Sequence, residues 1–68
     1  MGIRHLIKTR ETLKDNPTKS FSFNELRKIV GQNVPQVMEN IDYLNQQEGV
    51  VKRVPDEFGN TKLQWRKK

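Results

Sequence analysis

The sequence contains no cysteine, so the chain can form neither a disulfide framework nor a thiolate metal site. It has a single histidine, His5, and no cluster of histidine and acidic residues with the spacing of metal ligands. No apolar run approaches the roughly 18 residues that a membrane-spanning helix needs, and no signal-peptide core follows the first residues. We therefore expect no metal, no cofactor and no membrane association, and a cytoplasmic (or nucleoid-associated) location.

Residues that would support catalysis are equally scarce. No Gly-rich loop follows a predicted strand, which leaves no cradle for a phosphate group. Asp56 and Glu57 are adjacent, but side chains in a predicted turn need not converge, and a chain of 68 residues has little room for an enclosed active site. We expect that the protein is not an enzyme and has no catalytic residues.

Positive charge is plentiful, but it is missing from the middle of the chain. The formal net charge is +5 and the pI is near 9.9, which favours a polyanionic partner. Residues 1–30 carry a net charge of +4, residues 31–49 carry −3 with no base at all, and residues 50–68 carry +4. Basic segments therefore flank an acidic centre.

The first half of the chain predicts three helices. Ile3, Leu6, Ile7 and Leu13 recur at helical spacing and predict a helix over residues 3–15, which the Asp-Asn-Pro-Thr stretch at 15–18 ends. Ser22 and Glu25 have the spacing of a capping box for a helix over 22–30, and Gly31 suits its C-terminal cap. Asn33 and Gln36 repeat that spacing at the start of a helix over about 34–48.

After Gly49 the pattern of hydrophobic residues changes to that of strands. Residues 50–54 are rich in valine, residues 61–66 alternate polar and apolar side chains, and residues 55–60 between them are rich in turn formers. This predicts a hairpin over about 50–66, followed by a short basic tail at 66–68. We expect Leu63 and Trp65 to cover the core, and Phe58 to fold back onto the hairpin.

The order of these elements resembles a winged helix-turn-helix domain over residues 21–66. The resemblance rests on the capped segment SFNELRKIVG and on VPQVMENIDYLNQQEGVVKRV, in which apolar residues at 37, 41 and 44 have the family's core spacing. It implies an α+β fold in a single domain spanning residues 1–68, with three helices followed by a β-hairpin wing. It also implies a third helix that reads DNA.

The third helix has a neutral polar stripe opposite its apolar face. On a helical wheel Val34, Val37, Met38, Ile41 and Leu44 form the apolar arc, and the other side carries Gln36, Asn40, Tyr43 and Gln47. Asn and Gln can pair with adenine in the major groove without any charge. We interpret these four residues as candidates for reading bases.

Phosphate contacts would then come from the basic segments on either side. The candidates are Arg27, Lys28, Lys52, Arg53, Lys62 and Arg66. The prediction is a small transcriptional regulator that binds double-stranded DNA, with a possible homodimer, because one domain reads only a short site. The alternative is a protein-interaction module of adaptor or inhibitor type, which would use the acidic surface of Glu39 and Asp42, the acidic hairpin tip and Phe58.

Overall fold

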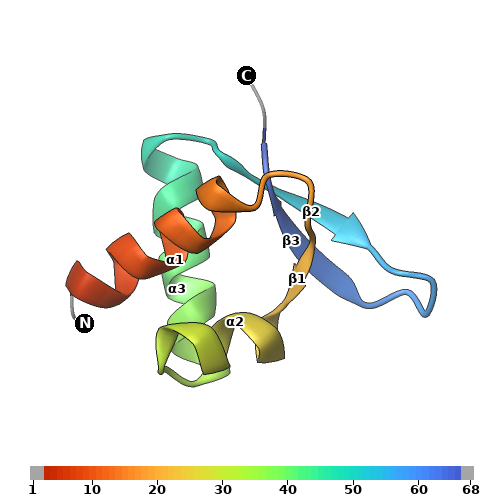
Figure 1. Ribbon diagram of the computed structural model, residues 1–68, viewed down its shortest axis with the longest axis horizontal. Helices are drawn as coiled ribbons and strands as arrows, with labels where there is room; N and C mark the ends of the chain where they lie inside the picture. Colours follow the sequence, from red (N-terminus) through yellow and green to blue (C-terminus); the bar gives the residue numbers. More distant parts are fainter. Residues whose placement is uncertain (1–2, 67–68) are drawn as a thin grey trace.

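Three helices and a small antiparallel sheet make up the fold. The computed structural model describes residues 3–66, which form α1 (Ile3–Asp15), β1 (Phe21–Ser22), α2 (Phe23–Val30), α3 (Val34–Gln47), β2 (Val51–Pro55) and β3 (Thr61–Trp65). Figure 1 shows the helices gathered on one side and the hairpin of β2 and β3 projecting from them. The predicted α+β class is confirmed.

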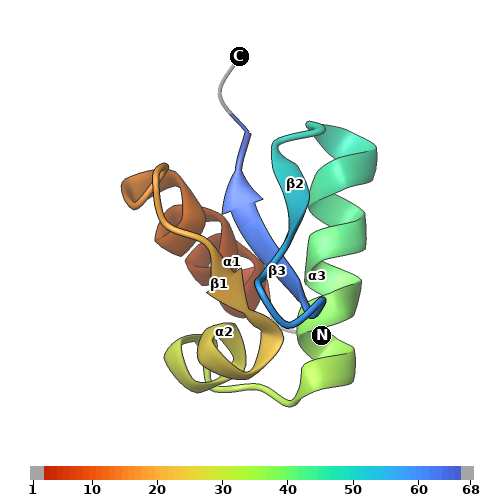
Figure 2. The same ribbon diagram turned by 90° about the vertical axis from the view of Figure 1, so that its right-hand side faces the viewer.

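Strand β3 lies in the middle of the sheet, whose order is β1-β3-β2 (Figure 2). The hairpin register pairs Val51 with Trp65 and Pro55 with Thr61, so the predicted antiparallel pairing of these two segments is confirmed. β1 pairs with β3 through only two positions, Phe21 with Leu63 and Ser22 with Lys62. This strand was not predicted, because two residues are too few to show an alternating pattern.

The predicted capping side chains fix the first residues of α2 and α3. The Ser22 hydroxyl accepts from the Glu25 amide at 3.1 Å, and the Glu25 carboxylate accepts from the Ser22 amide at 3.4 Å. Asn33 and Gln36 exchange the same two bonds, each at 3.1 Å. Both capping boxes are confirmed. Because a cap residue keeps an extended backbone, Ser22 can also belong to β1, and the second helix begins at Phe23 rather than at residue 22.

The core lies between the helices and one face of the sheet. Every helix and strand contributes to it, α1 only through Leu13 near its C-terminal end. The buried members are Leu13, Phe21, Leu26, Val37, Ile41, Leu44, Val50, Val51 and Leu63. Trp65 packs against this cluster, so the predicted roles of Leu63 and Trp65 are confirmed. Met38 was placed on the core-facing arc, but the residue is 46% exposed, because the arc of α3 that α1, α2 and β2 cover is narrower than predicted.

The hairpin turn is organised by Asp56. Its carboxylate Oδ1 accepts from the backbone amides of Phe58 at 2.9 Å and Asn60 at 2.8 Å, and Gly59 takes a positive φ of 82°. Such an Asx turn tightens the chain reversal. Phe58 is 81% exposed, so the prediction that it folds back onto the hairpin is wrong.

Candidate nucleic-acid interface

Three of the four residues of the predicted neutral stripe lie at the surface of α3. Gln36, Tyr43 and Gln47 are exposed, with Tyr43 at 45%. Gln36 is held at the helix start, since its Oε1 accepts from the Asn33 amide while its Nε2 remains able to donate. Each of these side chains can hydrogen-bond to a base edge or a phosphate without carrying charge.

Asn40, the fourth residue, is buried, so its predicted place in the stripe is wrong. Its side chain is 0% exposed, and Nδ2 donates to Gln32 Oε1 at 2.7 Å and to Thr9 Oγ1 at 3.3 Å. Thr9 in turn donates to the His5 carbonyl at 2.8 Å. At about 100° per residue, Asn40 lies about 60° from Val37, at the border of the apolar arc. Packing of α1 over that border turns a candidate base reader into a structural amide.

Two of the three acids in the central segment have basic partners. Glu48 accepts two bonds from the Arg10 guanidinium, at 2.8 and 3.0 Å. The hydrogen bond to Glu48 raises the pKa of Arg10 above its ordinary value. Desolvation of the guanidinium opposes this, and the negative charges of Glu48 and Glu11 reinforce it. Asp42 lies 3.5 Å from Arg53 on β2. Of the acids on α3, Glu39 alone is exposed without an ion pair within residues 3–66.

The predicted phosphate-contact bases divide between two faces of the hairpin. Cross-strand partners point to the same side, so the pairs Lys52–Gln64 and Val54–Lys62 share the sheet face that lies away from the buried Val51 and Leu63. Arg66 alternates to that same side. Arg53 lies on the other side, where it meets Asp42 of α3. The structure therefore brings one base of the hairpin, Arg53, beside α3 and separates it from the three others.

The remaining predicted bases lie at the end of α2 and of the chain. Lys28 is exposed, and Arg27 is half-buried with its Nε donating to Asn24 Oδ1 at 3.3 Å. The basic tail was predicted over 66–68. Lys67 and Lys68 lie outside the described residues, so only Arg66 of that tail has a place in the structure.

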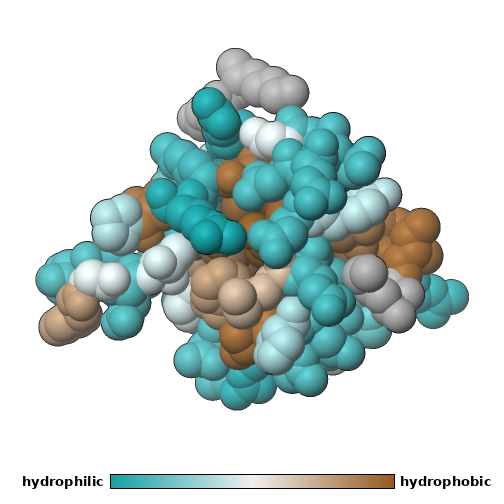
Figure 3. All heavy atoms as spheres, turned by 180° about the vertical axis from the view of Figure 1, so that it is seen from behind, coloured by the Kyte–Doolittle hydropathy of each residue, from teal (hydrophilic) through white to brown (hydrophobic). Residues whose placement is uncertain are grey.

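Exposed apolar side chains accompany the polar ones. Figure 3 views the molecule from behind, the side on which α3 lies, and shows a mainly hydrophilic surface with separate hydrophobic areas. The large apolar side chains that are exposed are Ile3, Ile7, Ile29, Met38, Tyr43 and Phe58. Met38 and Tyr43 belong to α3, so its outer surface is mixed rather than purely polar. Such a surface suits base edges and methyl groups as well as a protein partner.

Comparisons with protein-family models, with curated proteins and with solved structures give no match for this chain. Within residues 3–66 no three His, Asp or Glu side chains come together as a group that could hold a metal ion. No helix in that range is long and apolar enough to cross a membrane.

Proposed function

We propose that this protein is a winged-helix domain that binds double-stranded DNA through α3 and the adjoining edge of the β2–β3 hairpin, as a small transcriptional regulator. The observation that carries the proposal is the exposed surface of α3, where Gln36, Tyr43 and Gln47 can hydrogen-bond and where Arg53 of β2 lies 3.5 Å from Asp42 on another flank of the helix. Arg53 offsets part of the charge of Asp42, one of the two acids on α3, although the pair is exposed and the contact is long.

Different side chains would contact the bases and the phosphates. Gln36, Tyr43 and Gln47 provide donors and acceptors for base edges, and good bidentate pairs contribute about 1–3 kcal/mol of discrimination each. Three of the predicted phosphate-contact bases do not lie on the sheet face turned away from the core. They are Arg53, Lys28 and Arg27. Because few cations lie on this side, we expect modest affinity that depends on salt. A homodimer on a repeated site would increase the affinity.

The capped geometry of the turn between α2 and α3 supports the same proposal. Gly31 adopts φ 84° and, with Gln32, donates its amide to the Arg27 carbonyl, at 2.8 and 3.0 Å. The Asn33 cap then starts α3 at once. Such a turn holds the two helices at a fixed angle, and helix-turn-helix proteins need this to present their second helix to the groove.

The test is fluorescence anisotropy of a labelled random 20-base-pair duplex at several salt concentrations. We expect the logarithm of affinity to fall linearly with the logarithm of salt, with a slope of about 0.9 per phosphate contact. Arg53→Ala should weaken binding, because it removes a cation and also releases the charge of Asp42. Lys52→Ala is the matched control, since it removes one charge from the next position of the same strand on the opposite face.

Tyr43→Ala and Gln47→Ala test the helix itself. Both side chains are exposed, so their loss should leave folding intact and lower affinity for the preferred sequence more than for random duplex. Absence of binding at low salt, or equal losses from Lys52→Ala and Arg53→Ala, would overturn the proposal. In the first case, Phe58 and Glu39 are the residues to test for contact with a protein partner.

A further inference from the structure

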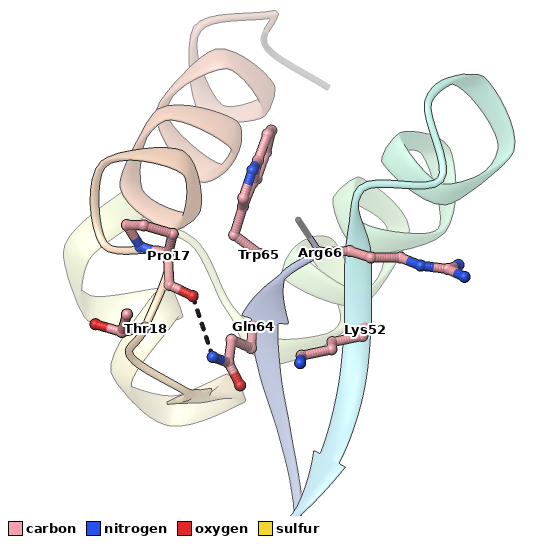
Figure 4. Close-up of a pocket in the computed structure, with 6 residues that line it drawn as sticks. All are labelled: Pro17, Thr18, Lys52, Gln64, Trp65 and Arg66. Carbon is pink, nitrogen blue, oxygen red and sulfur yellow. Dashed lines mark hydrogen bonds between the residues drawn. The ribbon is translucent and has the colours of Figure 1, made fainter. Parts of the chain in front are cut away.

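A hollow opens on β3 beyond the point at which β1 ends. Since β1 pairs only as far as Phe21 with Leu63, the edge of β3 at residues 64–66 has no neighbouring strand on that side. The loop after α1 runs past this gap and leaves a hollow of about 460 Å³, shown in Figure 4. Its lining residues are Pro17, Thr18, Lys52, Gln64, Trp65 and Arg66. The volume lies within the roughly 300–1,000 Å³ typical of small-ligand sites.

Two walls of the hollow, the loop after α1 and the Trp65 ring, are held in place. Gln64 Nε2 donates to the Pro17 carbonyl at 3.1 Å and ties the loop to the strand. On the inner side Trp65 packs against the core, and the Arg10 guanidinium lies 5.5 Å from the centre of its ring. Arg10 is itself fixed by its two bonds to Glu48. A site whose walls are fixed before binding loses little conformational freedom when a ligand enters.

The chemistry of the lining favours an anion. No carboxylate is among the lining residues, whereas the Lys52 ammonium, the Thr18 hydroxyl and the Trp65 indole N–H can all donate. Within residues 3–66, Lys52 and Arg66 take part in no ion pair. Figure 4 shows the Lys52 side chain reaching toward Gln64, while Arg66 extends outward past β2. Lys52 is thus the direct partner for a bound anion, and Arg66 adds positive potential at the rim.

Trp65 lies on the core side of β3, opposite Lys52, and together with Pro17 it adds an apolar surface to the inner part of the same hollow. A ligand that uses both parts carries a negative group beside a flat ring, and a nucleotide unit has this combination. Proteins bind nucleotide units of single strands by joining a basic groove to an aromatic side chain. We propose that the hollow binds a nucleotide unit, with its phosphate on Lys52 and its base against Trp65 and Pro17. The unit comes from a single strand or from a free nucleotide.

This site is separate from the proposed duplex-binding surface. Lys52 lies on the sheet face turned away from the core, whereas Arg53 lies beside α3. It also gives a role to Lys62, which shares a face with Lys52 and extends the positive surface along the strand. Either proposal can fail without the other, because each depends on its own base of β2.

Trp65 is the only tryptophan, so its intrinsic fluorescence reports on the hollow directly. We would titrate the wild-type protein with adenosine monophosphate, with a twelve-residue oligothymidylate and with inorganic phosphate. A saturable change with either nucleotide ligand, at concentrations where inorganic phosphate gives none, supports the proposal. A response to the mononucleotide identifies a free nucleotide as sufficient, and a response to the oligomer alone identifies a strand. An equal response to inorganic phosphate, or no response to any ligand, overturns it.

Variants separate the hollow from nonspecific charge effects. Lys52→Ala should weaken nucleotide binding about tenfold, as expected for the loss of one charge-assisted hydrogen bond. Arg66→Ala should have a smaller effect, and Arg53→Ala should leave binding unchanged. Equal effects of Lys52→Ala and Arg53→Ala would overturn the site. Thermal unfolding of each variant, followed by circular dichroism, checks that the fold is retained.

Trp65→Phe tests the contact between the base and the tryptophan ring. Because this variant has no tryptophan fluorescence, binding is followed with a labelled oligomer. Phenylalanine keeps an apolar ring against the core but presents a smaller surface and no N–H to the hollow. We expect anisotropy to show several-fold weaker binding of the oligomer to this variant and unchanged binding of duplex DNA. Unchanged oligomer binding by a folded Trp65→Phe variant would contradict the assigned base contact.

Discussion

Arg10 of α1 donates to both carboxylate oxygens of Glu48, which lies 38 residues further along the chain. Its guanidinium also lies over the ring of Trp65. One side chain therefore joins the first helix, the end of α3 and the central strand. The contact depends on the planar fork of arginine, which can bond two oxygens and face a ring at the same time.

Arg10→Lys tests the importance of this geometry. Lysine keeps the charge but cannot make the two-bond contact, so we expect the midpoint of thermal unfolding to fall by a few degrees. Arg53→Lys is the control, because Arg53 makes a single exposed contact at 3.5 Å with Asp42 and such pairs contribute little. Circular dichroism measures both. Equal midpoints for the two variants would show that charge alone, and not the fork, connects α1 to α3.

Asn40→Asp tests the buried amide of α3. A carboxylate cannot donate to Gln32 Oε1, and it would be buried against that acceptor. We expect the free energy of unfolding in urea to fall by roughly 2 kcal/mol or more. Gln47→Glu makes the same change of amide to acid at an exposed position of the same helix, and we expect less than about 0.5 kcal/mol there. Similar losses in the two variants would contradict the structural role of Asn40.

Gly31 tests the turn between α2 and α3. Its φ of 84° lies in the left-handed region, and a Cβ added there would meet no heavy atom within 4 Å. A substitution at this position would therefore destabilise the fold only through the strained left-handed backbone, and not through a steric clash. We expect Gly31→Ala to destabilise the fold by about 1 kcal/mol and Gly31→Asn by less, since asparagine tolerates this conformation. Chemical denaturation measures both, and an alanine variant as stable as the wild type would refute the assigned strain.

Asp56 tests whether the acid at the hairpin tip is structural. Asp56→Ala removes the acceptor for two backbone amides, and we expect faster hydrogen exchange of the β2 and β3 amides. Asp56→Asn keeps an acceptor oxygen and removes the charge, so it should preserve most of the protection. If the two variants exchange alike, the carboxylate has no organising role in the turn.

Glu39→Lys tests the proposed approach of α3 to DNA. Glu39 is exposed and forms no ion pair within the described residues, so reversing its charge should strengthen nonspecific duplex binding and steepen its salt dependence by about one contact. Glu11→Lys, on α1, changes the net charge equally at another surface. Anisotropy at low salt compares them. If Glu11→Lys strengthens binding as much as Glu39→Lys does, the effect comes from net charge and α3 does not enter the groove.

Local patterns in the sequence were sufficient for the helices, their caps and the hairpin. The capping boxes at Ser22 and Asn33 and the positive-φ Gly31 depend on contacts within a few residues, and the alternation of residues 61–66 shows which side of the strand is buried. These signals are local, so one sequence contains them in full. The two-residue β1 was missed because its only evidence is its partner on β3.

The candidate site depended on packing between distant segments. The wheel grouped Asn40 with Gln36, but only the packing of α1 and of the α2–α3 turn against α3 shows that Thr9 and Gln32 cover it. Likewise the sequence places Lys52 and Arg53 together in one basic run, and only the packing of the hairpin beside α3 brings Arg53 to Asp42. The sequence thus determined which side chains are available and which helices and strands hold them. The tertiary structure decided which of them reach solvent, because burial and ion pairing depend on neighbours that lie far along the chain.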